Sequence, residues 1–154
     1  MAGLYYEAFE VGRVMAHERR RTVTEADNQR FCDMTMNAQP LHLDAAFAAE
    51  TEFGERVVNG LYTMSLAVGL TIPDTTDGTI VANLSYDDVE HPAPVFHGDT
   101  IRAETEVLDK RETSDGDRGV VHMGVRAYRV EDGSEDTLVC SFERTVLSRK
   151  RDED

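Results

Sequence analysis

The sequence is poor in the residues that build metal centres and disulfide frameworks. It has two cysteines, Cys32 and Cys140, and no tryptophan in 154 residues. Because there is no Cys-x-x-Cys pair and no cluster of histidine with cysteine, a structural zinc site is excluded, and two reduced, apolar cysteines in an intracellular protein are expected. No apolar run approaches the ~20 residues that span a bilayer, so no membrane segment is expected.

Lysine is scarce, and acidic residues outnumber basic ones. Lys110 and Lys150 are the only lysines, and 30 acids against 16 bases give a net charge of −14. Such a surface repels phosphate backbones, which argues against nucleic acid as a partner. Two origins fit this composition: adaptation to a salty cytoplasm, which we favour, or a lysine-poor genome of high GC content. A pocket lined by arginine and backbone N–H groups can still bind an anion locally.

The length and the hydrophobic content suit a single domain. Of the 154 residues 40% are hydrophobic, which is enough for one core. We expect a domain over residues 1–148 and a charged tail over 149–154. The N-terminal segment 1–7 has neither the basic region nor the apolar stretch of a signal peptide, so a cytoplasmic location is expected.

The first half of the chain has the pattern of helices and loops. Thr22 or Thr24 can cap a first helix, with Glu25 in capping-box spacing from Thr22. On that helix Phe31 and Met34 lie at i and i+3, which predicts a buried face.

Two further helices are expected before the middle of the chain. Asp44 can cap a short helix over 45–51, which Gly54 would end. The segment 61–70 is apolar on nearly every side, so a helix there would be buried on most of its faces.

The second half changes to a period of two, which indicates strands with one exposed face. Alternation runs through 79–86, 100–107, 121–127 and 138–146. Glycine-containing turn sequences at 115–119 and 131–134 predict that the last three strands are antiparallel neighbours. One buried helix and a half-exposed antiparallel sheet indicate an α+β fold in which the sheet curls around the helix.

Four segments together resemble a known family. They are Thr22-Val23-Thr24-Glu25-Ala26-Asp27, then Asn37-Ala38-Gln39-Pro40-Leu41-His42-Leu43-Asp44, then Val58-Asn59-Gly60 at the start of the apolar helix, then Pro94-Val95-Phe96-His97-Gly98-Asp99-Thr100. In this order and spacing, from about residue 9 to 146, the chain resembles the MaoC-like (R)-specific enoyl-CoA hydratases, which are hot-dog proteins. The resemblance implies a single hot-dog fold.

The resemblance also implies a reaction, the syn addition of water to a 2-enoyl-CoA thioester or its reverse. In the family a carboxylate and a histidine on one loop hold the water, and a glycine N–H at the start of the central helix holds the thioester oxygen. The matching positions here are His42 and Gly60. An imidazole, with a pKa near ~6.5, can take a proton from water and return one to carbon. A free N–H at a helix N-terminus stabilises negative charge on the thioester oxygen.

One position departs from the family pattern. Asn37 stands where the family has its catalytic aspartate, and Gln39 where it has asparagine. Asn37 is neutral and cannot act as a base, so it would orient the water and leave His42 as the only acid/base; alternatively Asp33 or Asp44 supplies the carboxylate. We favour Asn37 as the positioning group. The variant motif resembles the branch of the family that handles short branched dicarboxylyl thioesters such as mesaconyl-CoA.

Gln39, Pro40, Asn59 and His97 are further candidates for substrate contacts. Asn59 could instead shape the turn before the helix, and His97 a turn rather than the pantetheine channel. His91, like the remaining histidines, has no distinguishing context. No cofactor is expected, and the partners expected are an acyl-CoA thioester and a second copy in a homodimer or larger homo-oligomer.

Three functions fit this sequence. They are an enoyl-CoA hydratase or dehydratase, a hot-dog acyl-CoA thioesterase, and a non-catalytic acyl-CoA-binding subunit, and the fold alone does not choose among them. The setting of His42 favours the first. A thioesterase needs a carboxylate to activate water, so Asn37 counts against the second and keeps the third open.

Overall fold

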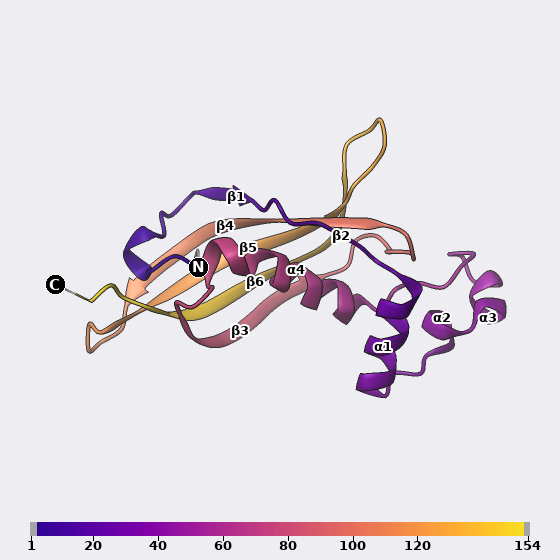
Figure 1. Ribbon diagram of the computed structural model, residues 1–154, viewed down its shortest axis with the longest axis horizontal. Coiled ribbons are helices and arrows are strands. Elements are labelled where there is room, and N and C mark those ends of the chain that lie inside the picture. The colour runs from indigo at the N-terminus through magenta and orange to yellow at the C-terminus, as the bar shows by residue number, and fades with distance from the viewer. Residues whose placement is uncertain (1–2, 153–154) are drawn as a thin grey trace.

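A curled antiparallel sheet wraps around one long helix in the computed structural model, which describes residues 3–152 (Figure 1). Within that range the sheet has six strands in the order β1-β4-β5-β6-β3, and β2 also pairs with β4. This arrangement confirms the α+β, hot-dog fold expected from the sequence. In chain order the elements are a 3-10 turn (Tyr6–Ala8), β1 (Val14–Ala16), β2 (Arg21–Thr22), α1 (Glu25–Thr35), α2 (Pro40–Leu43), α3 (Ala45–Ala49), α4 (Gly60–Thr75), β3 (Ile80–Glu90), β4 (Thr100–Glu112), β5 (Arg118–Arg129) and β6 (Thr137–Arg149).

The predicted alternation is confirmed on β4 and β5, and on β6 from Cys140 onward; Leu138, predicted to be buried, is partly exposed. On β4, for example, Ile101, Ala103, Thr105 and Val107 are at most 1% exposed, while the three residues that alternate with them are partly exposed. The turns that join the strands contain Gly116 (φ +71°) and Gly133 (φ +75°), in the left-handed region that glycine adopts without steric cost. The strands are antiparallel neighbours, as the turn sequences predicted.

The main core lies between α4 and the sheet. Burial of these apolar side chains is the largest favourable term that holds the helix in the curl of the sheet. The buried members are Val23, Val58, Ala67, Leu70, Val95, Ile101, Ala103, Val125, Ala127, Val139, Cys140 and Phe142.

A buried histidine also fixes the C-terminal end of α4. Nδ1 of His17 lies 2.6 Å from a carboxylate oxygen of Asp74 on α4, and its Nε2 lies 2.8 Å from the hydroxyl of Thr105 on β4. The side chain of His17 is fully shielded from solvent. The three groups therefore join the segment after β1 to the helix and the sheet.

The alternation predicted for 79–86 is wrong. β-bulges interrupt β3 between Ile80 and Ala82 and again after Asn83, and each extra residue resets the period. Asn83 and Tyr86 pair with Val146 and Arg144, which are buried on β6, so β3 positions on the same side of the sheet are three apart rather than two. Leu84, expected on the buried face, is 52% exposed.

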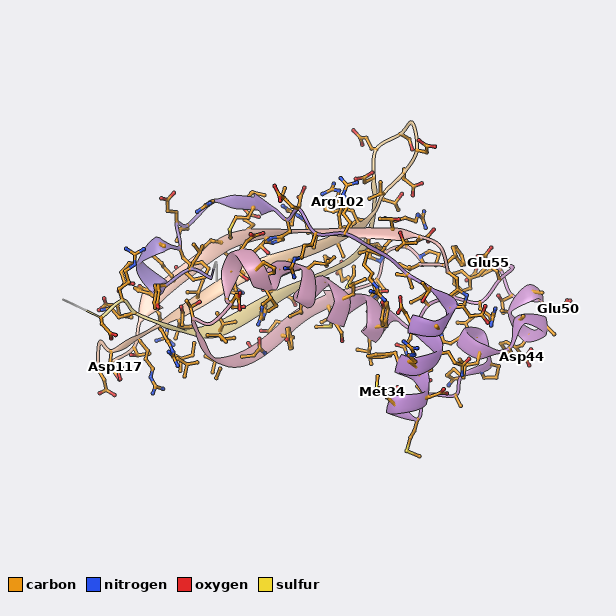
Figure 2. The ribbon with its side chains drawn as sticks, viewed as in Figure 1. Met34, Asp44, Glu50, Glu55, Arg102 and Asp117 are labelled. Carbon is orange, nitrogen blue, oxygen red and sulfur yellow. The ribbon has the colours of Figure 1, made fainter. Side chains whose placement is uncertain are left out.

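Two details of α1 also differ from the prediction. Thr24 caps the helix, as one alternative had it, but its capping-box partner is Asp27 and not Glu25. The buried positions are Asn28 and Cys32. Met34, predicted to be buried, is 77% exposed and extends away from the body of the molecule (Figure 2). The buried face is thus set by what lies beneath the helix, where α2 and the start of α4 present polar backbone.

Several short elements had no signal in the sequence. They are β1, β2 and the helical turn α2, which begins at Pro40. The helix expected over 45–51 ends earlier, at Ala49. Of the expected tail, Arg149 is the last residue of β6, and residues 153–154 lie outside the described part of the chain. Among the described helices none is both long enough and apolar enough to cross a membrane.

Candidate active site

A cavity of about 430 Å³ opens at the N-terminal end of α4. The cluster of α1, α2 and α3 lies at this end of the helix, away from both termini (Figure 1). Among the lining residues His42, Thr63 and His91 have polar side chains, and none is a carboxylate. The full lining is His42, Phe53, Val57, Val58, Gly60, Thr63, His91, Pro92, Ala93, Pro94, Val95 and Val139. Such an apolar chamber with a few convergent polar groups is typical of a small-molecule site.

His42 reaches the cavity from α2 with a defined tautomer. Its Nδ1 lies 2.7 Å from the carbonyl oxygen of Val57, which can only accept a hydrogen bond. Nδ1 therefore carries the proton, and in the neutral ring Nε2 has a free lone pair. His42 is partly buried and lines the cavity, so it is placed for proton transfer.

Gly60 is the first residue of α4, so its N–H has no acceptor within the helix. The preceding residue, Asn59, caps the helix by accepting the N–H of Leu61 on its side-chain oxygen at 2.9 Å. A Cβ at Gly60 would lie 3.0–3.2 Å from three atoms of the His91 ring. The glycine thus leaves room for an imidazole and for a ligand to approach the amide.

The structure therefore brings His42 and Gly60 to one cavity but does not place the other candidate site residues in its lining. Asn37 is partly buried, and its side-chain oxygen accepts the N–H of Gln39 at 3.3 Å. Gln39 and Pro40 are exposed. Asn59 is 3% exposed, and its cap shapes the start of α4.

The two alternative carboxylates are engaged elsewhere. Asp33 is exposed on α1 and accepts a hydrogen bond from Gln29 at 3.0 Å. Asp44 caps α3 by accepting the N–H of Phe47 at 3.1 Å, as the sequence predicted. Neither lines the cavity.

His97 lies behind the site rather than in its lining. Burial lowers the pKa of His97, and the nearby guanidinium of Arg56 lowers it further, so the ring favours the neutral form. Nε2 of His97 accepts a hydrogen bond from the side-chain amide of Asn28 at 3.3 Å. The adjacent turn is held by Asp99, which accepts the N–H of Phe96.

Sequence reasoning missed several residues of this region, among them Asn28 and His91. Asn28 is buried under the site and hydrogen-bonds to two of its segments. One signal in the sequence could have identified Asn28: it is a polar residue one helical turn before Cys32, on the face of α1 that is buried. His91 follows an edge strand, and nothing in its local sequence indicates that its ring reaches Gly60.

The site has no donor set for a metal. Across residues 3–152, no three His, Cys, Asp or Glu side chains come together in a way that could hold an ion.

Comparison with known proteins identifies the family. The model of the MaoC-like domain matches residues 7–128. The chain belongs to the MaoC-like domain family. It is 32% identical over 151 residues to a mesaconyl-CoA hydratase from Cereibacter sphaeroides, with 98% of this chain and 43% of the relative covered. It is 34% identical over 109 residues to an (R)-specific enoyl-CoA hydratase from Aeromonas caviae, with 69% of this chain and 76% of the relative covered.

The fold is shared with solved MaoC-like structures. A monoamine oxidase regulatory protein from Archaeoglobus superposes with a TM-score of 0.85 at 29% identity, covering 99% of this chain and 98% of the other. The chain spans less than half the length of the mesaconyl-CoA hydratase it matches.

Proposed function

We propose that this MaoC-like chain adds water to, or removes it from, the double bond of a 2-enoyl-CoA thioester. The observation that carries the proposal is that His42 and Gly60 line one apolar cavity, with Nε2 of His42 left unprotonated by the bond from Nδ1 to Val57. These are an acid/base and an oxyanion donor, the two groups that hydration requires.

In hydration, His42 takes one proton from water as the water oxygen bonds to C3 of the enoyl group. The C2=C3 double bond becomes single when C2 receives a proton from His42, so the ring returns to its starting state. Negative charge passes through the thioester oxygen during the reaction. The N–H of Gly60, at the positive end of the 16-residue helix α4, stabilises that charge.

Asn37 orients the attacking water in this proposal. Its side-chain oxygen is held by the N–H of Gln39, so its amide group can donate a hydrogen bond to water near α2, the turn that carries His42. Gln39 and Pro40 contact the substrate as it enters. Asn59 and His97 act by holding the protein groups around the cavity.

For the acyl group, a short branched dicarboxylyl thioester such as mesaconyl-CoA is proposed. The relative named mesaconyl-CoA hydratase matches almost the whole chain. Within the cavity lining, His91 is the one group besides His42 that can carry positive charge, and the second carboxylate of such a substrate needs a partner of that kind.

Hydration can be tested against the other two functions with one assay. Mesaconyl-CoA and crotonyl-CoA are mixed with the protein, and loss of enoyl-thioester absorbance is followed together with release of free thiol. Loss of absorbance without thiol is expected. Thiol release would indicate a thioesterase, and no change in either signal would indicate a binding protein.

The matched pair His42→Ala and His122→Ala tests the assignment of the base. His122 is a partly exposed histidine on β5, paired with Glu143 at 3.3 Å and outside the cavity. His42→Ala should lower kcat about 10²–10⁴-fold, the usual contribution of a general acid/base, and His122→Ala should leave it unchanged. Full activity in His42→Ala would refute the assignment.

A homodimer is also proposed. β3 lies at the end of the sheet order, where its outer edge is open to another strand. It carries exposed apolar side chains, among them Leu84 and Tyr86, which are 52% and 43% exposed.

In sedimentation at molar salt we expect a dimer, and we expect Leu84→Asp to dissociate it. Val14→Asp is the control, since Val14 is equally exposed (51%) on β1 at the opposite end of the sheet order. A wild-type monomer would contradict the proposal.

We also propose that the protein is cytoplasmic and that its acidic surface is an adaptation to salt. A CoA thioester substrate and two free, buried cysteines suit a reducing compartment. Burial raises the pKa of the Cys140 thiol to about 11, which makes it unreactive. If the net charge of −14 reflects adaptation to salt, the midpoint of thermal unfolding should rise steeply between low and molar salt.

A further inference from the structure

The side chain of Asn28 on α1 is 1% exposed, although it has two polar ends. An amide that is removed from water costs free energy unless its donor and acceptor groups are paired. The partners of Asn28 therefore show what the residue is for.

Each end of this amide binds a different part of the site. The Nδ2 group donates to the main-chain oxygen of His42 at 3.1 Å, and it also lies 3.3 Å from Nε2 of His97. The Oδ1 atom accepts the main-chain N–H of Asn59 at 3.0 Å, and Asn59 is the residue directly before Gly60. The side-chain amide of Asn28 thus bridges His42 and Asn59, the residue directly before Gly60.

The short turn that carries His42 does not fix this spacing alone, although the N–H of Val57 also donates to the oxygen of Leu41 at 3.1 Å. His42 lies on a helical turn of four residues, α2, which is too short to be rigid by itself. The bond from His42 to Val57 orients the imidazole ring. Asn28 instead binds the main chain of His42 and so holds the position of the whole residue relative to α4.

We propose that Asn28 is a positioning residue that sets the separation between the imidazole of His42 and the N–H of Gly60. The inference rests on the proposed hydratase activity, because it concerns how those two groups act on one substrate. Proton transfer and oxyanion stabilisation both depend on placement to within about 1 Å, and a misplacement of that size can lower a rate ~10²-fold. Asn28 itself does not line the cavity, so it acts through the two residues that it holds.

Asn28→Leu tests the proposal, because leucine fills a similar volume but neither donates nor accepts a hydrogen bond. The control is Thr75→Val at the far end of α4, which removes another buried side-chain hydrogen bond, from Thr75 Oγ1 to the oxygen of Thr71 at 2.6 Å. Asn28→Ser, with a small hydroxyl, is a milder second variant. Each variant is compared with wild type by thermal unfolding and by kcat and KM for crotonyl-CoA and mesaconyl-CoA.

Asn28→Leu should lower kcat about 10- to 100-fold while KM changes less than about threefold. Thr75→Val should lose thermal stability but keep its kcat. If Asn28→Leu does not fold, Asn28→Ser should show the same selective loss of kcat. The proposal is overturned if a folded Asn28 variant has the same kcat as Thr75→Val. It is also overturned if both variants lose kcat along with their thermal stability. A wild-type chain that is inactive on both thioesters would instead overturn the proposed function, and this inference with it.

Discussion

The sheet formed by β4, β5 and β6 and the segment from residue 24 to 60 are held in place by different interactions. The strands are long and joined by antiparallel backbone hydrogen bonds along most of their length, and much of their inner face packs against α4. The segment 24–60 contains two helices of only four and five residues. Side chains bonded to main chain fix it: Thr24 and Asp44 cap helices, Asn28 bridges two segments, and His42 binds Val57.

This difference separates stability from activity. The sheet is stabilised by apolar burial, which tolerates exchanges of similar volume. The site depends on polar bonds between named atoms, so the loss of one partner changes the geometry more than the free energy of unfolding. Substitutions in the two regions should therefore affect different measurements.

The largest effect on stability is expected from Ile101→Ala on β4. Ile101 is fully buried against α4, and removing a buried isoleucine side chain costs about 2–5 kcal/mol of unfolding free energy. Denaturant unfolding measures the loss, and kcat per folded molecule should stay at the wild-type value. Arg111→Ala, at an exposed position of the same strand, is the control and should change stability by less than about 0.5 kcal/mol. A selective fall of kcat in Ile101→Ala would break the division between the two regions.

His91→Gln tests a residue that belongs to both regions, because His91 follows the strand β3 while its ring lies against Gly60. If His91 binds the second carboxylate of a dicarboxylyl thioester, its loss removes a charge-assisted hydrogen bond. We expect kcat/KM for mesaconyl-CoA to fall about tenfold, or about 1.4 kcal/mol, while crotonyl-CoA is unaffected. An equal loss for both thioesters would mean that His91 does not distinguish the acyl groups.

The same contrast explains which features the sequence could predict. The alternation on β4 and the glycines at 116 and 133 follow from local sequence, so β4, β5, most of β6 and the turns between them were predicted correctly. The bulges in β3 depend on how it pairs with β6, and no local pattern indicates them. For the site, the resemblance led to His42 and Gly60, which share a cavity. Asn28 was missed because its role comes from long-range hydrogen bonds, to residues 14 and 31 positions further along the chain.

A smaller effect is expected from the pH dependence of His97. Its pKa lies below the usual ~6.5 because of burial, so between that value and its lowered pKa the unfolded chain binds more protons than the folded one. Stability should therefore be complete above about pH 6.5 and decline as the pH falls through the lowered pKa. A protonated His97 also cannot accept the hydrogen bond from Asn28.

His97→Gln keeps an acceptor near Nε2 but does not titrate, so it isolates this contribution. Unfolding free energies of wild type and variant are measured from pH 7.5 to 5 at constant high salt. The wild type should lose more stability than the variant over this range, with the difference appearing below about pH 6.5. Parallel curves would show that His97 does not contribute.

The smallest effect is expected from Met34→Gln on α1. A helical period alone placed Met34 on the buried face, but it is 77% exposed and extends outward, whereas Cys32 on the same helix is 1% exposed. In an isolated chain the substitution should change unfolding free energy by less than about 0.5 kcal/mol. Thermal unfolding should be measured at two protein concentrations. A loss above about 1 kcal/mol that grows with concentration would mean that another copy covers Met34. In that case the segment 24–60 would be stabilised partly by apolar burial, as the sheet is, and the two regions would differ less than the single chain indicates.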